Sequence, residues 1–180
     1  MLDLYSQIPQ ALHLHCSTFL LGIRIDSNLS WNLHIDYITS KLNCRINLLR
    51  RSKQFLYLHC RKLLYNSLVK PILEYCCTVW GNCSKEQLNR LLRLQKRCAR
   101  IILDANFQDN SVMLFTQLNW LPIDDIICAR KLSLLHKISN DHGREYLSSY
   151  VNYVKSGHNY NTKPQKEIIL LRPNPRKIQA

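Results

Sequence analysis

The sequence predicts a mainly α-helical domain that carries one short N-terminal strand and a basic, partly disordered C-terminal tail. After Ser30, apolar residues recur at steps of three and four, which places them on one face of a helix. The chain holds 4 glycines and 6 prolines among 180 residues, fewer than a turn-rich β-protein would need. Hydrophobic residues make up 46% of the chain, which is enough for a core and excludes general disorder.

Three segments organise the chain. Residues 1–18 show no firm period and are expected to form a poorly specified leader, and residues 19–154 hold the strand and the helices. Residues 155–180 are polar and basic, so we expect a tail that is mobile unless a ligand orders it. Its basic cluster comprises Lys163, Lys166, Arg172, Arg176 and Lys177.

The strand is predicted over residues 18–26, where Ile23 and Ile25 flank Arg24 as in a strand with one buried face. A strand is not stable alone, because its backbone needs a hydrogen-bonded partner. We therefore expect a solitary or poorly paired strand whose original partner is missing from this chain.

Helical spacing and local end signals predict a series of helices after the strand. Ser30 is placed to cap the first, whose apolar stripe runs from Trp31 to Leu49. Pro71 suits either the first turn of a third helix or a kink in a continuous one. The predicted helices cover residues 31–51, 58–69, 72–80, 84–103, 111–118, 124–142 and 146–154.

Seven large apolar residues are expected in the core rather than on a surface that stacks nucleobases, because each falls on an apolar helix face. They are Trp31, Leu42, Leu68, Trp80, Leu91, Ile102 and Trp120.

The helix predicted over residues 84–103 combines a capping box with two opposed stripes. Ser84 and Gln87 have the spacing at which each side chain bonds the other's backbone amide. An apolar stripe runs from Leu88 to Ile102, broken by the polar Gln95. A cationic stripe on the opposite side consists of Arg90, Arg93, Arg97 and Arg100, helped by Lys85 and Lys96. Taken alone, this stripe is most simply interpreted as a solvated face, and the alternative is a face that follows a phosphate backbone.

The charge of the whole chain favours the second interpretation of this stripe. Lys and Arg number 25 against 12 Asp and Glu, a formal net charge of +13. Folding does not require such an excess, so a polyanionic partner is expected, with nucleic acid as the first candidate and an anionic membrane surface as the second. No apolar run approaches the length of a membrane span, so none is expected.

Neither the cysteines nor the acids predict a metal site. The 8 cysteines include no C-x2-C pair, and His13, His15 and Cys16 lack a second ligand pair. Without a secretory signal, reduced thiols in an intracellular compartment, cytoplasm or nucleus, are expected. Asp124 and Asp125 resemble half of a two-metal carboxylate site, but the first turn of a helix attracts acids through its dipole, and we prefer that explanation.

Five motifs follow one another along residues 19–163. They read Phe19-Leu-Leu-Gly-Ile-Arg-Ile-Asp-Ser-Asn-Leu-Ser-Trp-Asn-Leu-His-Ile, Leu64-Tyr-Asn-Ser-Leu-Val-Lys-Pro-Ile-Leu-Glu-Tyr-Cys, Val79-Trp-Gly, Leu94-Gln-Lys-Arg-Cys-Ala-Arg-Ile-Ile and Leu118-Asn-Trp-Leu-Pro-Ile. Their order and separations resemble the C-terminal part of the reverse transcriptase of non-LTR (LINE-type, jockey-like) retrotransposons. Any one motif is weak, whereas five in order are specific.

The resemblance implies a helical, thumb-like bundle from an RNA-directed DNA polymerase. In that family the region follows the palm, begins with the strand near the primer grip and holds the RNA/DNA template-primer duplex mainly through its phosphates. The family's Tyr/Phe-x-Asp-Asp motif, which binds two Mg²⁺ ions, is expected upstream of residue 19, where this sequence has only Asp3. We therefore expect a fragment truncated at both ends, with no catalytic residues, metal site or cofactor of its own and no polymerase activity.

Two other functions remain open. The chain can instead be a non-enzymatic helical module for protein interaction or structure, whose basic faces are only solvated. A nucleolytic enzyme that uses Asp124, Asp125 and a histidine is a weaker alternative, because no histidine lies near this pair in the sequence. Nucleic-acid affinity that falls steeply with salt would separate the thumb-like fragment from the interaction module.

Overall fold

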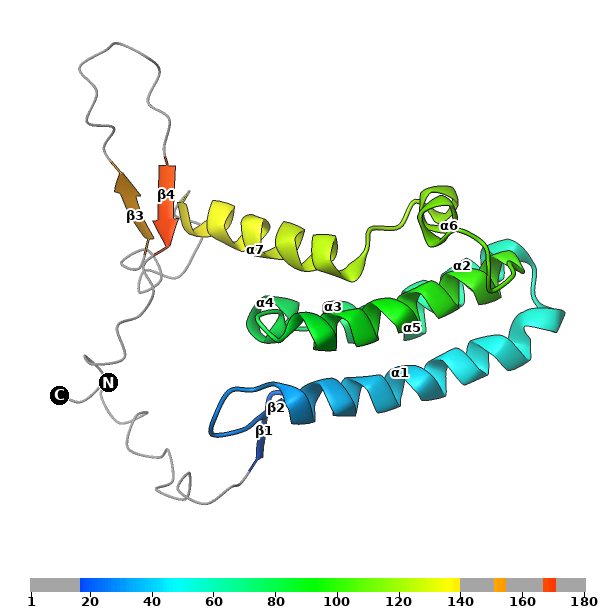
Figure 1. The fold of residues 1–180 in the computed structure, drawn as a ribbon, viewed down its shortest axis with the longest axis horizontal. Coiled ribbons are helices and arrows are strands. Elements are labelled where there is room, and N and C mark those ends of the chain that lie inside the picture. The colour runs from blue at the N-terminus through cyan, green and yellow to red at the C-terminus, as the bar shows by residue number, and fades with distance from the viewer. Residues whose placement is uncertain (1–16, 140–150, 155–166, 171–180) are drawn as a thin grey trace, which may run out of the picture. The chain divides into compact units, whose positions relative to one another are not determined.

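The structure is a computed structural model that describes residues 17–139, 151–154 and 167–170 (Figure 1). The chain divides into two compact units, residues 1–128 and 129–180. The described part of the first unit is mainly α-helical and opens with a short antiparallel sheet, which confirms the predicted fold class. Most of the predicted leader and most of the predicted tail lie outside the described residues.

The predicted strand is a hairpin. Strand β1 (Thr18–Leu20) pairs antiparallel with β2 (Ile23–Ile25), and Leu20 lies opposite Ile23. The two-residue turn has φ of 48° at Leu21 and 81° at Gly22, and positive φ at both positions is the pattern of a type I′ hairpin turn. The expectation of a solitary strand was therefore wrong, because the partner lies within the same nine residues of sequence.

The helices follow the hairpin in an order close to the predicted one. They are α1 (Asn32–Ser52), α2 (Leu58–Leu68), α3 (Lys70–Glu74), α4 (Cys77–Trp80), α5 (Lys85–Leu103), α6 (Ser111–Leu118) and α7 (Ile123–Ser139), with a short 3₁₀ turn η2 (Lys53–Phe55) after α1. The predicted ends of α5 and α6 agree with the structure.

Two helix boundaries differ from the prediction. The N-cap of α1 is Trp31, with φ of 62°, while the Ser30 hydroxyl accepts a bond from the Asn32 amide at 3.4 Å. The predicted helix over residues 72–80 is broken at Tyr75 and Cys76, where Cys76 has φ of 48°. Trp80 spans the break, because its indole N–H donates to the Tyr75 carbonyl at 2.8 Å.

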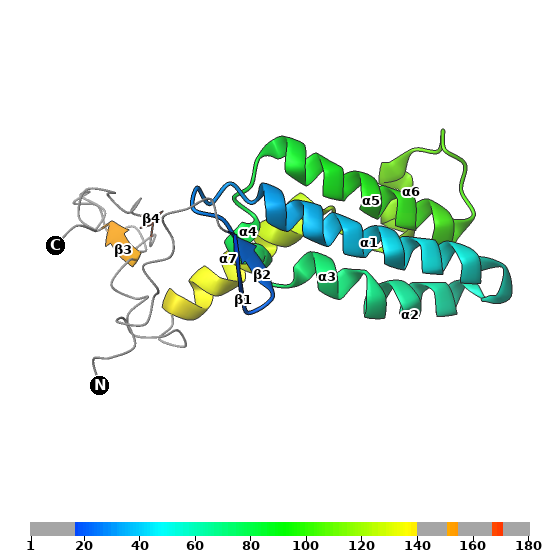
Figure 2. The ribbon, with the colours of Figure 1, turned by 90° about the horizontal axis from the view of Figure 1, so that it is seen from below.

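The first unit is organised around a bundle of α1, α5 and the pair α2–α3. Figures 1 and 2 show α1 and α5 lying side by side along most of their length, with α2 against both helices and α3 against α1. Five of the seven predicted core residues are buried between these helices: Trp31, Leu42, Trp80, Leu91 and Ile102. Leu68 and Trp120 are only half-buried, and Trp120 stacks on Tyr65 with 3.7 Å between ring centroids.

The second unit holds a further hairpin. Strand β3 (Val151–Val154) pairs antiparallel with β4 (Glu167–Leu170), with Val151 opposite Leu170 and Val154 opposite Glu167. The predicted helix over residues 146–154 was thus wrong for its last four residues, and the predicted tail contributes a strand. Val151 and Val154 are β-branched and favour a strand once a partner is present.

Candidate nucleic-acid interface

The N-terminus of α5 is fixed beside that of α1 by the predicted capping box. The Ser84 hydroxyl accepts from the Gln87 amide at 3.3 Å, and the Gln87 side chain accepts from the Ser84 amide at 2.9 Å. The buried Gln87 also donates through Nε2 to the Asn32 side chain and, at 3.3 Å, to the Ser30 carbonyl. The Gln87 side chain therefore caps the N-terminus of α5 and also links it to the N-terminus of α1.

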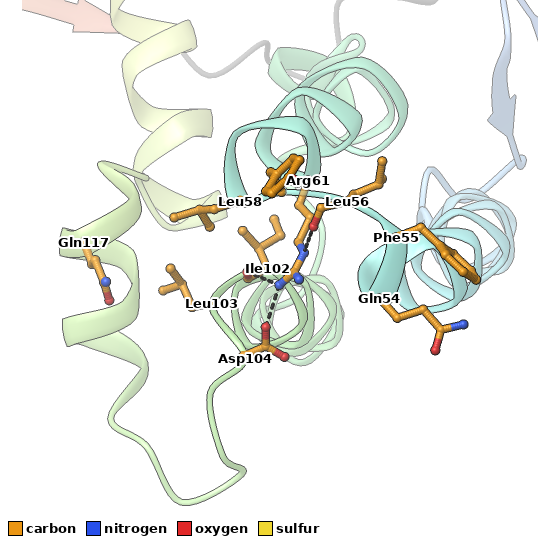
Figure 3. Close-up of a pocket in the computed structure, with 10 residues that line it drawn as sticks. Gln54, Phe55, Leu56, Leu58, Arg61, Ile102, Leu103, Asp104 and Gln117 are labelled. Atoms are coloured by element: carbon orange, nitrogen blue, oxygen red, sulfur yellow. Dashed lines mark hydrogen bonds and ion pairs between the residues drawn. The ribbon is translucent and has the colours of Figure 1, made fainter.

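Arg61 and Asp104 fix the opposite end of α5. Figure 3 shows Arg61 reaching from α2 to the end of α5, in a hollow of about 600 Å³. Its Nε donates to the Leu56 carbonyl at 2.8 Å, and its Nη1 donates to the Ile102 carbonyl at 3.1 Å and to Asp104 Oδ2 at 2.6 Å. Lys53 also pairs with Asp104, and hydrogen bonds from Lys53 and then Arg61 lower the pKa of this carboxyl. The end of α1 is thereby joined to the end of α5.

Between these fixed ends lies a basic groove of about 760 Å³. It is formed by the end of α1, the C-terminal half of α5 and the turn that follows α5. Six of its nine lining residues are cationic and none is acidic. The lining consists of Arg50, Lys53, Arg93, Lys96, Arg97, Arg100, Ile101, Ala105 and Phe107.

The structure brings four of the six predicted contact residues into this groove, namely Arg93, Lys96, Arg97 and Arg100. The other two do not line it. Arg90 pairs with Asp36 of α1 at 2.7 Å, so its charge is partly neutralised. Lys85 is exposed at the first position of α5, about 12 Å along the helix axis from Arg93 at 1.5 Å per residue.

Three of the residues that line the groove were not predicted from the sequence. Arg50 in the last turn of α1 and Lys53 in η2 lie roughly forty residues before the groove residues of α5, and only the packing of α1 on α5 brings them near. Phe107 lies in the turn after α5, which carried no helical or strand period. A basic last turn in α1 was the signal available, but it is equally explained by the helix dipole.

Most of the groove cations are not neutralised by the protein. Within residues 17–139, Arg50, Lys96, Arg97 and Arg93 form no ion pair with a carboxylate. Arg93 donates to the Asn89 carbonyl of its own helix at 3.3 Å, which leaves its charge uncompensated. Several like charges close together raise the local potential and attract a polyanion.

The predicted acidic pair has the geometry expected of a helix start. Asp124 and Asp125 are exposed in the first turn of α7. In the part of the chain that the structure describes, no three His, Cys, Asp or Glu residues gather as a metal site would need. His13, His15 and Cys16 lie outside that part.

The cysteines and the hydropathy add two findings. Among the described residues, Cys44, Cys60, Cys76, Cys98 and Cys128 are free thiols, and burial raises the pKa of Cys98 to about 12. None of the described helices is both long and apolar enough to cross a membrane.

Two curated proteins from Drosophila melanogaster are similar to this chain. The probable RNA-directed DNA polymerase from transposon BS is 29% identical over 110 residues, which cover 59% of this chain and 12% of that protein. The probable RNA-directed DNA polymerase from transposon X-element is 23% identical over 156 residues, which cover 85% of this chain and 17% of that protein. No family model and no solved structure matches. The chain thus spans less than a fifth of the length of these relatives, and the similarity supports a reverse-transcriptase-related region.

Proposed function

We propose that this chain is the post-palm, thumb-like region of a non-LTR, LINE-type and jockey-like reverse transcriptase, and that it holds nucleic acid through the phosphate backbone. The observation that carries the proposal is the basic groove, where six cations from α1, η2 and α5 gather without an acid among the lining residues. The similarity to transposon polymerases agrees with it, because such enzymes must hold a template and a primer.

The groove suits a regular row of phosphates. From Arg93 to Arg100, α5 advances about 10 Å at 1.5 Å per residue, which spans about three phosphates of one strand at 3.4 Å along the duplex axis. Arginine suits this task because its planar guanidinium can donate to two phosphate oxygens at once. Backbone contacts of this kind position a duplex without reading its bases. The proposed partner is therefore a template-primer duplex bound without sequence preference.

Polymerisation is not proposed for this chain alone. The two-metal reaction needs carboxylates that hold both Mg²⁺ ions against the attacking and leaving oxygens. The sequence contains no Tyr/Phe-x-Asp-Asp motif, and its Asp124-Asp125 pair follows Pro122-Ile123 at the start of a helix. The chain would grip nucleic acid, and the catalytic carboxylates would come from elsewhere in a complete polymerase.

Binding to a fluorescent duplex DNA, measured by anisotropy across a range of salt concentrations, tests the proposal. Each phosphate contact contributes about 0.9 to the slope of log affinity against log salt. The triple variant Arg93→Gln, Lys96→Gln and Arg97→Gln should therefore reduce the slope by up to about 2.7. The measurement should show this loss with the helical circular dichroism unchanged.

A matched variant separates local contacts from total charge. Arg45→Gln, Lys62→Gln and Lys70→Gln remove the same number of charges from exposed or partly buried positions that do not line the groove. This variant should keep nearly the full slope. Equal slopes for the two variants, or no binding by the unmodified chain, would contradict the proposal and favour a helical protein-interaction module.

A further inference from the structure

Phe107 is the aromatic residue among the nine that line the basic groove, and 88% of its surface is accessible. One exposed apolar side chain is ordinary on a protein surface and by itself indicates nothing. The setting of Phe107 distinguishes it from the other exposed aromatics, because it stands among cations that face a common hollow.

The turn that carries Phe107 is held in place by its own backbone. After α5, Asp104 adopts φ of 57° and the Ala105 amide donates to the Arg100 carbonyl at 3.0 Å. The Asn106 amide then donates to Asp109 Oδ2 at 2.7 Å, and the Asp109 amide donates back to the Asn106 carbonyl at 3.3 Å. Phe107 is the second residue of this closed turn, so its ring projects from an ordered base.

Arg100 links this ring to the cationic wall of the groove. Its guanidinium carbon lies 5.4 Å from the centroid of the Phe107 ring, within the range of a cation–π contact. The same guanidinium reaches the Asp109 carbonyl at 3.5 Å, and its buried Nε has no hydrogen-bond partner among the described residues. The side chain therefore combines a ring contact with unused capacity to donate a hydrogen bond.

We propose that Phe107 stacks on an unpaired nucleobase of a strand whose phosphates lie in the basic groove. The inference rests on the proposed function, because the phosphates bring the base to the ring. A cationic groove with an aromatic side chain is the arrangement by which proteins hold single-stranded nucleic acid, and stacking tolerates any base because each has a π face. An apolar protein segment fits less well, since it would desolvate the unpaired cations of the groove without neutralising them.

The proposal assigns a preferred substrate form, a duplex that continues into a single strand. A blunt duplex offers phosphates to the groove but no free base, whereas a single-stranded extension offers both. One stacked base should increase affinity about fivefold or more for the extended duplex. The duplex end that enters the groove would then be the junction between paired and unpaired strand.

The test compares a blunt duplex DNA with the same duplex carrying a four-nucleotide single-stranded extension, by anisotropy at fixed salt. The unmodified chain should prefer the extended duplex about fivefold, and Phe107→Ala should abolish that preference by lowering the affinity for the extended duplex more than the affinity for the blunt duplex. Phe107→Trp should retain the preference and show tryptophan quenching when the extended duplex is added. Phe55→Ala is the matched control, because Phe55 is 78% exposed and does not line the groove.

The outcomes distinguish the stacking role of Phe107 from the proposed backbone binding on which it rests. Salt-dependent binding of blunt duplex with no preference for the extension overturns the stacking role and leaves the backbone role intact. Equal loss of affinity for both substrates in Phe107→Ala also overturns it, since the ring would then only support the groove. A change of oligomeric state in Phe107→Ala, seen by light scattering, would assign the ring to a protein contact instead. No binding of either substrate would overturn both proposals.

Discussion

His34 is buried in α1 among aromatic rings, with 2% of its surface exposed. Its Nδ1 accepts from the Arg24 amide at 3.2 Å, which assigns the neutral tautomer with the proton on Nε2. That Nε2 has no hydrogen-bond partner within residues 17–139. The ring centroids of Trp31 and Trp80 lie 6.4 and 6.0 Å from the centroid of the His34 ring. Burial, and then the charge of Lys41, lower the pKa of His34.

This environment predicts a stability that falls as the pH falls. The unfolded chain protonates His34 at its ordinary pKa of about 6.5, while the folded chain resists protonation. Between the folded and the unfolded pKa the unfolded state binds more protons, so the free energy of unfolding should drop by up to about 1.4 kcal/mol per pH unit below about pH 6.5. Urea unfolding at about pH 7 and about pH 5.5 measures this drop.

The variant His34→Gln should be less stable at neutral pH but should lose less on acidification, because glutamine does not titrate in this range. His59→Gln provides the control, because it makes the same substitution at an exposed position on α2. If His34→Gln and the unmodified chain lost the same free energy on acidification, another group would be responsible.

At the scale of elements, Gly81 controls the contact between α4 and α7. A Cβ at this buried position would stand 2.6 Å from Ile127 Cγ2 and would also collide with the Cys77 carbonyl. The backbone φ of −70° is ordinary, so space and not conformation requires the glycine. The space beside Gly81 is filled in part by the Ile127 side chain of α7, nearly fifty residues later in the sequence.

We expect Gly81→Ala to lower the free energy of unfolding by about 1–3 kcal/mol, which is the usual cost of overpacking a core. Urea denaturation of the purified variant measures it. Ile127→Ala removes one of the two clashing groups, at its own cost in burial, and leaves the clash with the Cys77 carbonyl, so the double variant should lose less than the sum of the single losses. Additive losses would show that the Ile127 contact does not set the requirement for glycine.

Local signals predicted the elements whose ends are encoded in short stretches. The capping box of Ser84 and Gln87 gave the start of α5 correctly because both partners lie within one turn. The β1–β2 hairpin was missed because its turn is Leu21-Gly22, without the Asn-Gly or Asp-Gly pair that marks such turns. The break at Cys76 was also missed, since a non-glycine residue rarely adopts positive φ, and the Trp80 side-chain bond to the Tyr75 carbonyl that spans the break has no simple sequence signature.

The candidate site was predictable only where it lies on one helix. The spacing of Arg93, Lys96, Arg97 and Arg100 along α5 is visible in the sequence, and the structure places all four in one groove. Arg50 and Phe107 join them through the packing of α1 and the course of the turn after α5, which no local pattern encodes. The ion pair of Arg90 with Asp36 also depends on that packing, so its absence from the groove could not be foreseen.

At the scale of the whole molecule, the charge of the chain gives salt two opposite effects. A net charge of +13 destabilises the compact protein through repulsion, and salt screens that repulsion. A bound polyanion relieves the same repulsion, but salt weakens its binding by removing the gain from counterion release. Whether nucleic acid is bound therefore determines whether salt raises or lowers the stability of the folded chain.

We expect the melting temperature of the free protein to rise as salt is added, and that of the protein saturated with duplex DNA to fall. A duplex at about 100 times its dissociation constant should stabilise the fold by about 2.7 kcal/mol, or roughly 5–10 °C for a chain of this size. Differential scanning calorimetry at low and high salt, with and without duplex, measures both trends. The Arg93→Gln, Lys96→Gln, Arg97→Gln variant should keep the rise of the free protein but show little stabilisation by duplex, whereas the Arg45→Gln, Lys62→Gln, Lys70→Gln variant should keep both. A melting temperature that rises with salt equally in the presence and absence of duplex would mean that the basic groove is only solvated.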